Sequence, residues 1–340
     1  MARSVPQVVS VAAVVIGVLL FILTLYYIDL DETVESAKRL GFALPIILMP
    51  GTLWHLLRTW GWSVAFPDEF RPAFTRLVRV RLAADAIGFF TVRGLAGDPL
   101  KILLLYDRVT PEVTTASVAL ERLAFAVISI VMAGCISFFA VRRLAMPVAW
   151  DTLFTLTSVG AVVLLGILIL VARRRRGDYL GRLVIRLDRV TGRRLEASRA
   201  VQFVLDVEDV LLDLLRGDRR RLVILTVLPI VCYFVMAFEV WLVLWAVGEP
   251  IGITAALTIE TFARLGSIAS AAIPGNLGAL EASNAVPVAM LGLSGGGALA
   301  LARRIRSLLW AGLGLALYPQ VQSQPAARRQ LPASRASQDQ

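Results

Sequence analysis

A long apolar stretch with a polar break in its middle sets the tightest limit on how this chain can fold. Residues 253–292 are mostly apolar, but residues 273–281 read IPGNLGALE and end on Glu281. Nothing in the hydrocarbon of a membrane can hydrogen-bond the backbone groups that such a break frees, so it must be packed inside protein or line a polar cavity. A glutamate at this depth is costly and therefore indicates a partner or a function.

The overall composition is that of a polytopic membrane protein. Hydrophobic residues make up 57% of the 340 positions, and several segments exceed the roughly 18 apolar residues that can span a bilayer. The net charge of +10 does not indicate nucleic-acid binding, because the arginines lie at the ends of apolar segments, as the positive-inside rule describes. We expect a multi-pass protein of the plasma (inner) membrane with no nucleic-acid partner.

The residues needed for common catalytic or metal sites are scarce. His55 is the only histidine, and Cys135 and Cys232 lie in apolar segments without a CxxC pattern. The chain shows no HExxH, P-loop or Rossmann fingerprint and no Ser/His/Asp set. The sequence therefore predicts no catalytic residue, no metal, no cofactor and no enzymatic activity, and a membrane-embedded lipid transferase stays the least favoured alternative.

Charge asymmetry predicts the topology. The arginine-rich residues 173–199 are expected to be cytoplasmic, as are both termini and the loop that holds Arg71, Arg76, Arg79 and Arg81. The tryptophans at 54, 60 and 62 are interpreted as an interfacial belt. The expected fold is all-α, with about six full spans and two broken re-entrant hairpins. The spans are 5–28, 41–60, 116–141, 151–171, 222–247 and 299–318, and the hairpins are 82–105 and 253–292.

The two hairpins indicate an inverted repeat. Counting helices from the cytoplasmic segments makes the first hairpin enter from the inside and the second from the outside. Gly97 precedes Arg122 by 25 positions (122 − 97), and Gly278 precedes Arg303 by the same 25 (303 − 278). Paired broken helices of opposite orientation are typical of transporters. We expect one membrane domain, residues 1–318. Its repeat halves are about 41–141 and 222–318, joined by span 151–171 and the basic linker 173–221, and a disordered cytoplasmic tail follows at 319–340.

Several short motifs support this interpretation. They are GDPLK at 97–101, ASVALER at 116–122, PGNLGALE at 274–281, LGLS at 291–294 and ALALARR at 298–304. With them, residues 10–320 resemble the flippase-like integral membrane domain of the lysylphosphatidylglycerol synthase type, as a stand-alone member without the soluble aminoacyl-transferase domain. Departures are Asp98 where glutamate is usual, the inserted Pro99, and Asn276 in place of a frequent glycine.

The resemblance implies a lipid flippase or transporter-like protein of envelope lipid metabolism, which moves or binds an anionic, glycosylated or isoprenoid lipid. The alternative is a non-catalytic scaffold or accessory subunit for a lipid-modifying or glycosyl-transferring enzyme, recruited through the basic linker. Expected partners are membrane lipids and, for the scaffold, a membrane or cytosolic lipid-pathway enzyme. The sequence indicates no oligomeric state.

The candidate substrate-binding residues are charged or break-forming residues near membrane depth. They are Arg93, Asp98, Lys101, Glu121, Arg122, Arg264, Pro274, Gly275, Gly278, Glu281, Arg303 and Arg304. Their arginines either bind a lipid phosphate through their planar forks or form structural ion pairs with nearby acids. Glu281 is expected to form one cluster with Lys101, Arg122 and Arg304, and could alternatively couple transport to protons. Arg306 is expected at the interface.

Overall fold

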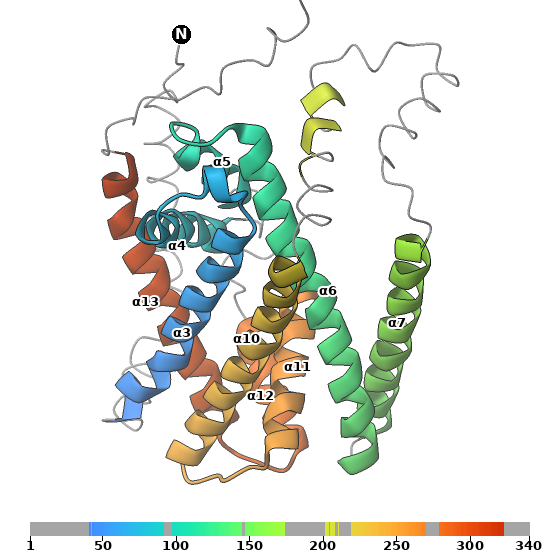
Figure 1. Cartoon of the computed structure of the whole chain (residues 1–340). Coiled ribbons are helices and arrows are strands. Elements are labelled where there is room, and N and C mark those ends of the chain that lie inside the picture. The colour runs from blue at the N-terminus through green and yellow to red at the C-terminus, as the bar shows by residue number, and fades with distance from the viewer. Residues whose placement is uncertain are drawn as a thin grey trace, which may run out of the picture.

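The computed structural model describes residues 41, 43–91, 97–144, 147–173, 201–203, 205–207, 210, 219–269 and 279–322. The regular structure of these residues is entirely helical (Figure 1). The elements are α3 (Ala43–Val64), η1 (Asp68–Phe70), α4 (Phe74–Phe90), α5 (Gly97–Leu105), α6 (Pro111–Arg143), α7 (Val148–Arg173), α10 (Arg219–Ala246), α11 (Ile253–Ala269), α12 (Ala279–Met290) and α13 (Gly296–Gln322).

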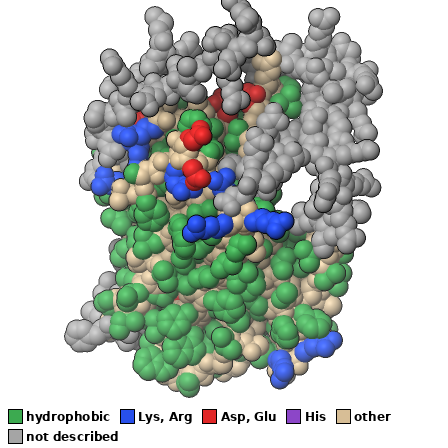
Figure 2. All heavy atoms as spheres, viewed as in Figure 1, with side chains coloured by type: hydrophobic (Ala, Val, Ile, Leu, Met, Phe, Trp, Pro, Cys, Tyr) green, Lys and Arg blue, Asp and Glu red, His purple; other side chains and the backbone are tan. Residues whose placement is uncertain are grey.

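Three of these helices are long and apolar enough to cross a membrane. Within the described residues they are α6, the part of α7 from Val148 to Ile167, and α10. Helix α6 begins with Pro111, which suits a first helical position because its missing N–H would lack an intrahelical partner. Hydrophobic side chains cover most of the face shown in Figure 2, and charged ones gather mainly toward its upper end. The surface chemistry is therefore that of a protein immersed in lipid.

The helices form two groups of four with the same order and the same packing. The first group is α3–α6, the second is α10–α13, and the second helix of each has 17 residues. Helices α3 and α10 pack on each other, α4 packs on α13, and α11, the counterpart of α4, packs on α6. In Figure 1 the chain enters and leaves the α4–α5 pair at the upper end and the α11–α12 pair at the lower end. The two groups thus have opposite orientations.

Glycines permit two of the close helix crossings. A Cβ on Gly314 of α13 would lie 2.2 Å from the carbonyl oxygen of Leu82 on α4. A Cβ on Gly134 of α6 would lie 2.2 Å from the Cβ of Ala161 on α7. Small residues at such crossings let helix backbones approach closely, which is the main source of helix association in lipid.

The structure corrects two sequence expectations near the first helix pair. Arg76 and Arg81, predicted to lie in a cytoplasmic loop, are buried within α4, because this helix begins at Phe74 rather than near residue 82. Trp62 is only 1% exposed, and its Nε1–H donates to Ser117 Oγ at 3.2 Å, so it is a core residue and not part of a belt. The expected span 5–28 and most of the basic linker lie outside the described residues.

Candidate functional site

A cavity of about 360 Å³ lies where the two helix groups meet. Helices α3, α4, α5 and α6 line it on one side, and α10, α11, α12 and α13 on the other. Such a volume is in the range of small-ligand sites. The described lining contains six arginines and two carboxylates: Arg58, Arg81, Arg122, Arg264, Arg303, Arg306, Asp85 and Glu260.

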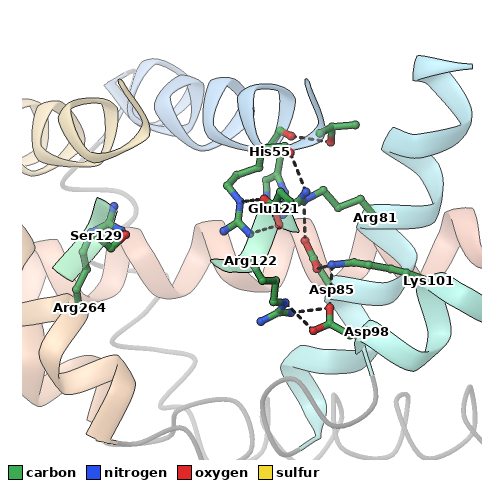
Figure 3. A network of polar contacts seen from close by, with 11 residues as sticks. His55, Arg81, Asp85, Asp98, Lys101, Glu121, Arg122, Ser129 and Arg264 are labelled. Carbon is green, nitrogen blue, oxygen red and sulfur yellow. Dashed lines mark hydrogen bonds and ion pairs between the residues drawn. The ribbon is translucent and has the colours of Figure 1, made fainter. Parts of the chain in front are cut away.

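A continuous chain of ion pairs runs along one wall of the cavity, and we call it the first ion-pair chain. Its members alternate in sign in the order Arg58, Glu121, Arg81, Asp85, Lys101, Asp98 and Arg122. Figure 3 shows Asp85 between Arg81 and Lys101, and Asp98 between Lys101 and Arg122. The chain joins α3, α4, α5 and α6, so each helix of the first group contributes to it.

Glu121 of α6 is the carboxylate of the first ion-pair chain that accepts the most hydrogen bonds from arginines. Glu121 accepts two hydrogen bonds from Arg58, at 2.6 Å from Nε and 3.0 Å from Nη2. It accepts a third at 3.3 Å from Nη2 of Arg81. Its side chain is 6% exposed, and bidentate pairing of this kind compensates a buried charge well.

The remaining links are formed by α5 and its neighbours. The ammonium of Lys101 lies 3.3 Å from Asp85 Oδ1 and 3.2 Å from Asp98 Oδ1. Asp98 also pairs with Arg122, at 2.6 Å from Nε to Oδ2. Lys101 is buried, whereas the Arg122 side chain is 44% exposed, so the first ion-pair chain runs from the core to an open end.

A second ion-pair chain occupies the opposite wall, in the order Arg264, Glu260, Arg303, Glu239 and Arg306. Arg303 is at its centre, with Nη2 at 2.5 Å from Glu260 Oε2 and Nε at 3.5 Å from Glu239 Oε2. Its Nη1 donates to Asn284 Oδ1 at 2.8 Å. The ion pairs of this chain join α10, α11 and α13, and the hydrogen bond to Asn284 connects them to α12, the remaining helix of the second group.

The two ion-pair chains have related positions and opposite charges. Arg81 and Asp85 are the eighth and twelfth residues of α4, and Glu260 and Arg264 are the eighth and twelfth residues of α11, a helix of the same length. On α6 a glutamate holds arginines from α3 and α4, and on α13 Arg303 holds glutamates from α10 and α11. The repeat has therefore kept the positions of its buried ion pairs while exchanging their signs.

Aromatic side chains complete the cavity wall. The guanidinium of Arg58 lies 3.9 Å from the ring centre of Phe125, and that of Arg264 lies 5.8 Å from the same ring. His55 and Trp310 contact each other at 4.6 Å between ring centres. His55 Nδ1 and Trp310 Nε1 are both buried without a hydrogen-bond partner among the described residues, so the cavity presents unsatisfied polar atoms as well as charges.

The structure distributes the predicted site residues over three groups. Asp98, Lys101, Glu121 and Arg122 lie in the first ion-pair chain. Arg264 and Arg303 lie in the second. The last described pair is Glu281 with Arg304, whose Nε donates at 2.7 Å. The other four predicted residues, Arg93, Pro274, Gly275 and Gly278, lie outside the described residues.

The expected cluster around Glu281 is wrong in its partners. Of the three predicted cations, Arg304 pairs with Glu281, while Lys101 and Arg122 contact Asp98. Arg306 is not interfacial either: its side chain is 18% exposed and pairs with the fully buried Glu239.

Sequence reasoning did not select Arg58 and Arg81 as site residues. Arg58 lies between Trp54 and Trp60, in a segment interpreted as a span that ends in an aromatic belt, and Arg81 was assigned to a loop. The spacing of Arg81 and Asp85, four residues apart, is the signal that could have placed both on one helical face.

A comparison with protein families agrees with this architecture. The sequence profile of the family described as the lysylphosphatidylglycerol synthase TM region matches residues 10–316. No curated protein and no solved structure matches the chain.

Proposed function

The chain belongs to the lysylphosphatidylglycerol synthase TM region family, and on this premise we propose that it moves the headgroup of a polar lipid between the leaflets of the plasma membrane. The headgroup occupies the cavity between the two helix groups while the acyl chains remain in the surrounding lipid. Membership of this family makes the chain a multi-pass membrane protein with a flippase-like domain associated with lipid modification.

The proposed topology follows from the two helix groups. Helices α6, α7 and α10, the three long apolar helices, cross the membrane, and α3 and α13 cross beside them with Arg58, Arg303 and Arg306 in the cavity lining. The proposal keeps the sequence-based expectation that residues 5–28 span the membrane and that both termini are cytoplasmic. The α4–α5 pair is a re-entrant hairpin from the cytoplasmic side, and the α11–α12 pair is one from the outside. In transporters built this way, rocking of one repeat against the other exposes a midplane site to each side in turn.

The observation that carries the proposal is the position of the charged cavity. Both hairpins contribute to it: α4 through Arg81 and Asp85, and α11 through Glu260 and Arg264. Charges buried at membrane depth are costly and usually mark a substrate or ion pathway. A polar headgroup that enters the cavity would exchange its hydrogen bonds with water for hydrogen bonds from the fixed arginine donors of the lining.

We propose binding and movement, and no covalent chemistry, at this site. The lining is dominated by arginines, which keep their proton at all physiological pH values and so suit anion binding better than proton transfer. Of the two lining carboxylates, Glu260 already accepts hydrogen bonds from Arg264 and Arg303, and Asp85 forms ion pairs with Arg81 and Lys101.

Filling the cavity tests the proposal. Ala263 of α11 lines the cavity and is 7% exposed, so Ala263→Trp places a large ring inside it. Val163 of α7 is 55% exposed on the apolar surface, so Val163→Trp adds the same ring outside the cavity. Each protein is reconstituted into phosphatidylcholine vesicles with fluorescent anionic or zwitterionic phospholipids, and a membrane-impermeant quencher reports the lipid exposed outside.

We expect the unmodified protein and Val163→Trp to move fluorescent lipid from the inner to the outer leaflet, where the quencher reaches it. In vesicles with Ala263→Trp, the inner-leaflet lipid should become quenchable only at the rate seen in protein-free vesicles. Normal movement of lipid by Ala263→Trp would contradict the site. A chain that moves none of the probes would favour the scaffold alternative.

A further inference from the structure

Both ion-pair chains of the cavity begin and end on an arginine. The first ion-pair chain runs from Arg58 to Arg122 and has four cations and three carboxylates. The second runs from Arg264 to Arg306 and has three cations and two carboxylates. Each chain therefore carries one positive charge more than it can pair internally, and together they carry a formal charge of +2 (seven cations against five carboxylates).

This surplus lies where charge is expensive. Of the four terminal arginines, Arg58, Arg264 and Arg306 have side chains that are 12%, 18% and 18% exposed, while Arg122 at the open end is 44% exposed. Buried charges are tolerated when they are paired, so two surplus positive charges at membrane depth favour the entry of an anion. The neighbouring pair of Arg304 and Glu281 is balanced and does not change this count.

The arginines at the ends of both ion-pair chains face the cavity. All four terminal arginines, Arg58, Arg122, Arg264 and Arg306, line the cavity. Each has a single carboxylate partner among the ion pairs of the described residues. Arg58 and Arg264, one from each helix group, lie against the same Phe125 ring, so the two ion-pair chains approach each other there. Arginine forks of this kind match the geometry of phosphate oxygens.

A neutral donor in the same wall points to the same ligand chemistry. Trp310 Nε1 is buried, lines the cavity and has no partner among the described residues. An indole N–H can only donate, so it needs an acceptor such as a phosphate oxygen. Arg306 and Trp310 both border Gly51, since a Cβ built there would lie 2.7 Å from Arg306 Cδ and 3.2 Å from Trp310 Nε1.

We propose that the cavity selects a lipid with a dianionic phosphate-monoester headgroup over phosphodiester and zwitterionic lipids. A phosphate monoester carries a charge of about −1.5 to −2 at pH 7, because its second pKa is near 6. It therefore neutralises both ion-pair chains, whereas a phosphodiester leaves one charge unpaired. This inference rests on the proposed function and specifies its substrate class.

Competitive lipid binding tests the selection. The purified full chain is mixed with equal amounts of phosphatidic acid, phosphatidylglycerol and phosphatidylcholine of identical acyl chains, and bound lipids are counted by native mass spectrometry. We expect phosphatidic acid to be preferred over phosphatidylglycerol by about ten-fold or more at pH 7.5, as for the loss of one charged hydrogen bond. The preference should decline below pH 6, where the monoester takes up one proton and becomes a monoanion.

Charge-reducing variants show whether the ion-pair chains cause the preference. Arg122→Gln and Arg264→Gln each neutralise one chain, and the double variant should bind phosphatidic acid and phosphatidylglycerol equally. Asn284→Asp lowers the charge by one without removing an arginine. It keeps the acceptor for Arg303 Nη1, loses the donor to the Leu280 carbonyl, and should weaken the preference as well. Arg76→Gln removes a buried arginine whose ion pair with Asp107 lies outside the cavity lining, and should keep the preference.

The outcomes separate this inference from the proposed function. Equal binding of the two anionic lipids by the unmodified chain, or an unchanged preference in the double variant, overturns the dianion selection while leaving lipid binding intact. No binding of any lipid overturns both. Displacement of phosphatidic acid by millimolar inorganic phosphate would identify a free phosphate rather than a lipid as the ligand, and would also overturn the proposal.

Discussion

Replacing Arg303 should destabilise the protein more than any exposed arginine does. Its side chain is 5% exposed, and its guanidinium contacts Glu239, Glu260 and the side-chain oxygen of Asn284. Arg303→Gln keeps the approximate length of the side chain but removes the charge. Two buried carboxylates, 0% and 5% exposed, are then left with one arginine each.

The expected cost is about 3–5 kcal/mol, as found when one member of a buried ion pair is removed. The charge left on the carboxylates causes most of it, so adding Glu260→Gln should recover part of the loss. We expect a coupling free energy of at least about 1 kcal/mol between the two substitutions, within the usual range for residues in contact. Arg142→Gln, an exposed arginine stacked on Phe138 at the end of α6, should stay within about 0.5 kcal/mol.

Unfolding in mixed micelles of a mild detergent and sodium dodecyl sulfate, followed by tryptophan fluorescence, measures these free energies. The four proteins of the Arg303 and Glu260 cycle are compared at one lipid and detergent composition. Additive effects of the two substitutions, or a cost for Arg303→Gln no larger than that of Arg142→Gln, would refute the assignment of Arg303 as the centre of the second ion-pair chain.

Three further predictions concern packing and pH. Gly314→Ala should destabilise the chain by about 1–3 kcal/mol in the same assay through overpacking, whereas Gly312→Ala, with open space beside it, should be neutral or stabilising. Gly134→Ala should cost a similar amount by separating α6 from α7. Glu249, in the loop before α11, accepts hydrogen bonds from a hydroxyl and two backbone amides just before α13, and these hold its pKa below the usual value. Its stabilisation is present above the unfolded pKa and is lost as pH falls through the folded one, so Glu249→Gln should flatten the dependence of melting temperature on pH between 7 and 3.

The fold could largely be predicted from the sequence because membranes impose simple rules. Apolar length and arginine-rich ends located the long apolar helices α6, α7 and α10, since each of these signals is a local property of the chain. Pro111 marked the start of α6 for the same reason. The start of α4 was missed, because Arg76 and Arg81 look like loop charges until their ion-pair partners, Asp107 and Glu121, are known.

The site was predicted in its residue types but not in its pairing. Charges at membrane depth identified Asp98, Lys101 and Arg303, yet which acid meets which base depends on how helices distant in sequence pack. The sequence indicated the repeat itself but not the correspondence of its buried charges, because Arg81 and Glu260 occupy equivalent places with opposite signs. A sequence alignment of the two repeats scores such a pair as a mismatch, although both residues form buried ion pairs.

Two-sided access to the cavity tests the central claim most directly. Ser307 lines the cavity, so Ser307→Cys in a chain with Cys135→Ser and Cys232→Ser places a single thiol there. A charged, membrane-impermeant thiol reagent is applied to right-side-out and to inside-out vesicles, with and without a polar lipid that the chain moves. We predict labelling from both sides, and protection by that lipid. Labelling from one side only, or no labelling from either, would contradict a cavity that serves both leaflets.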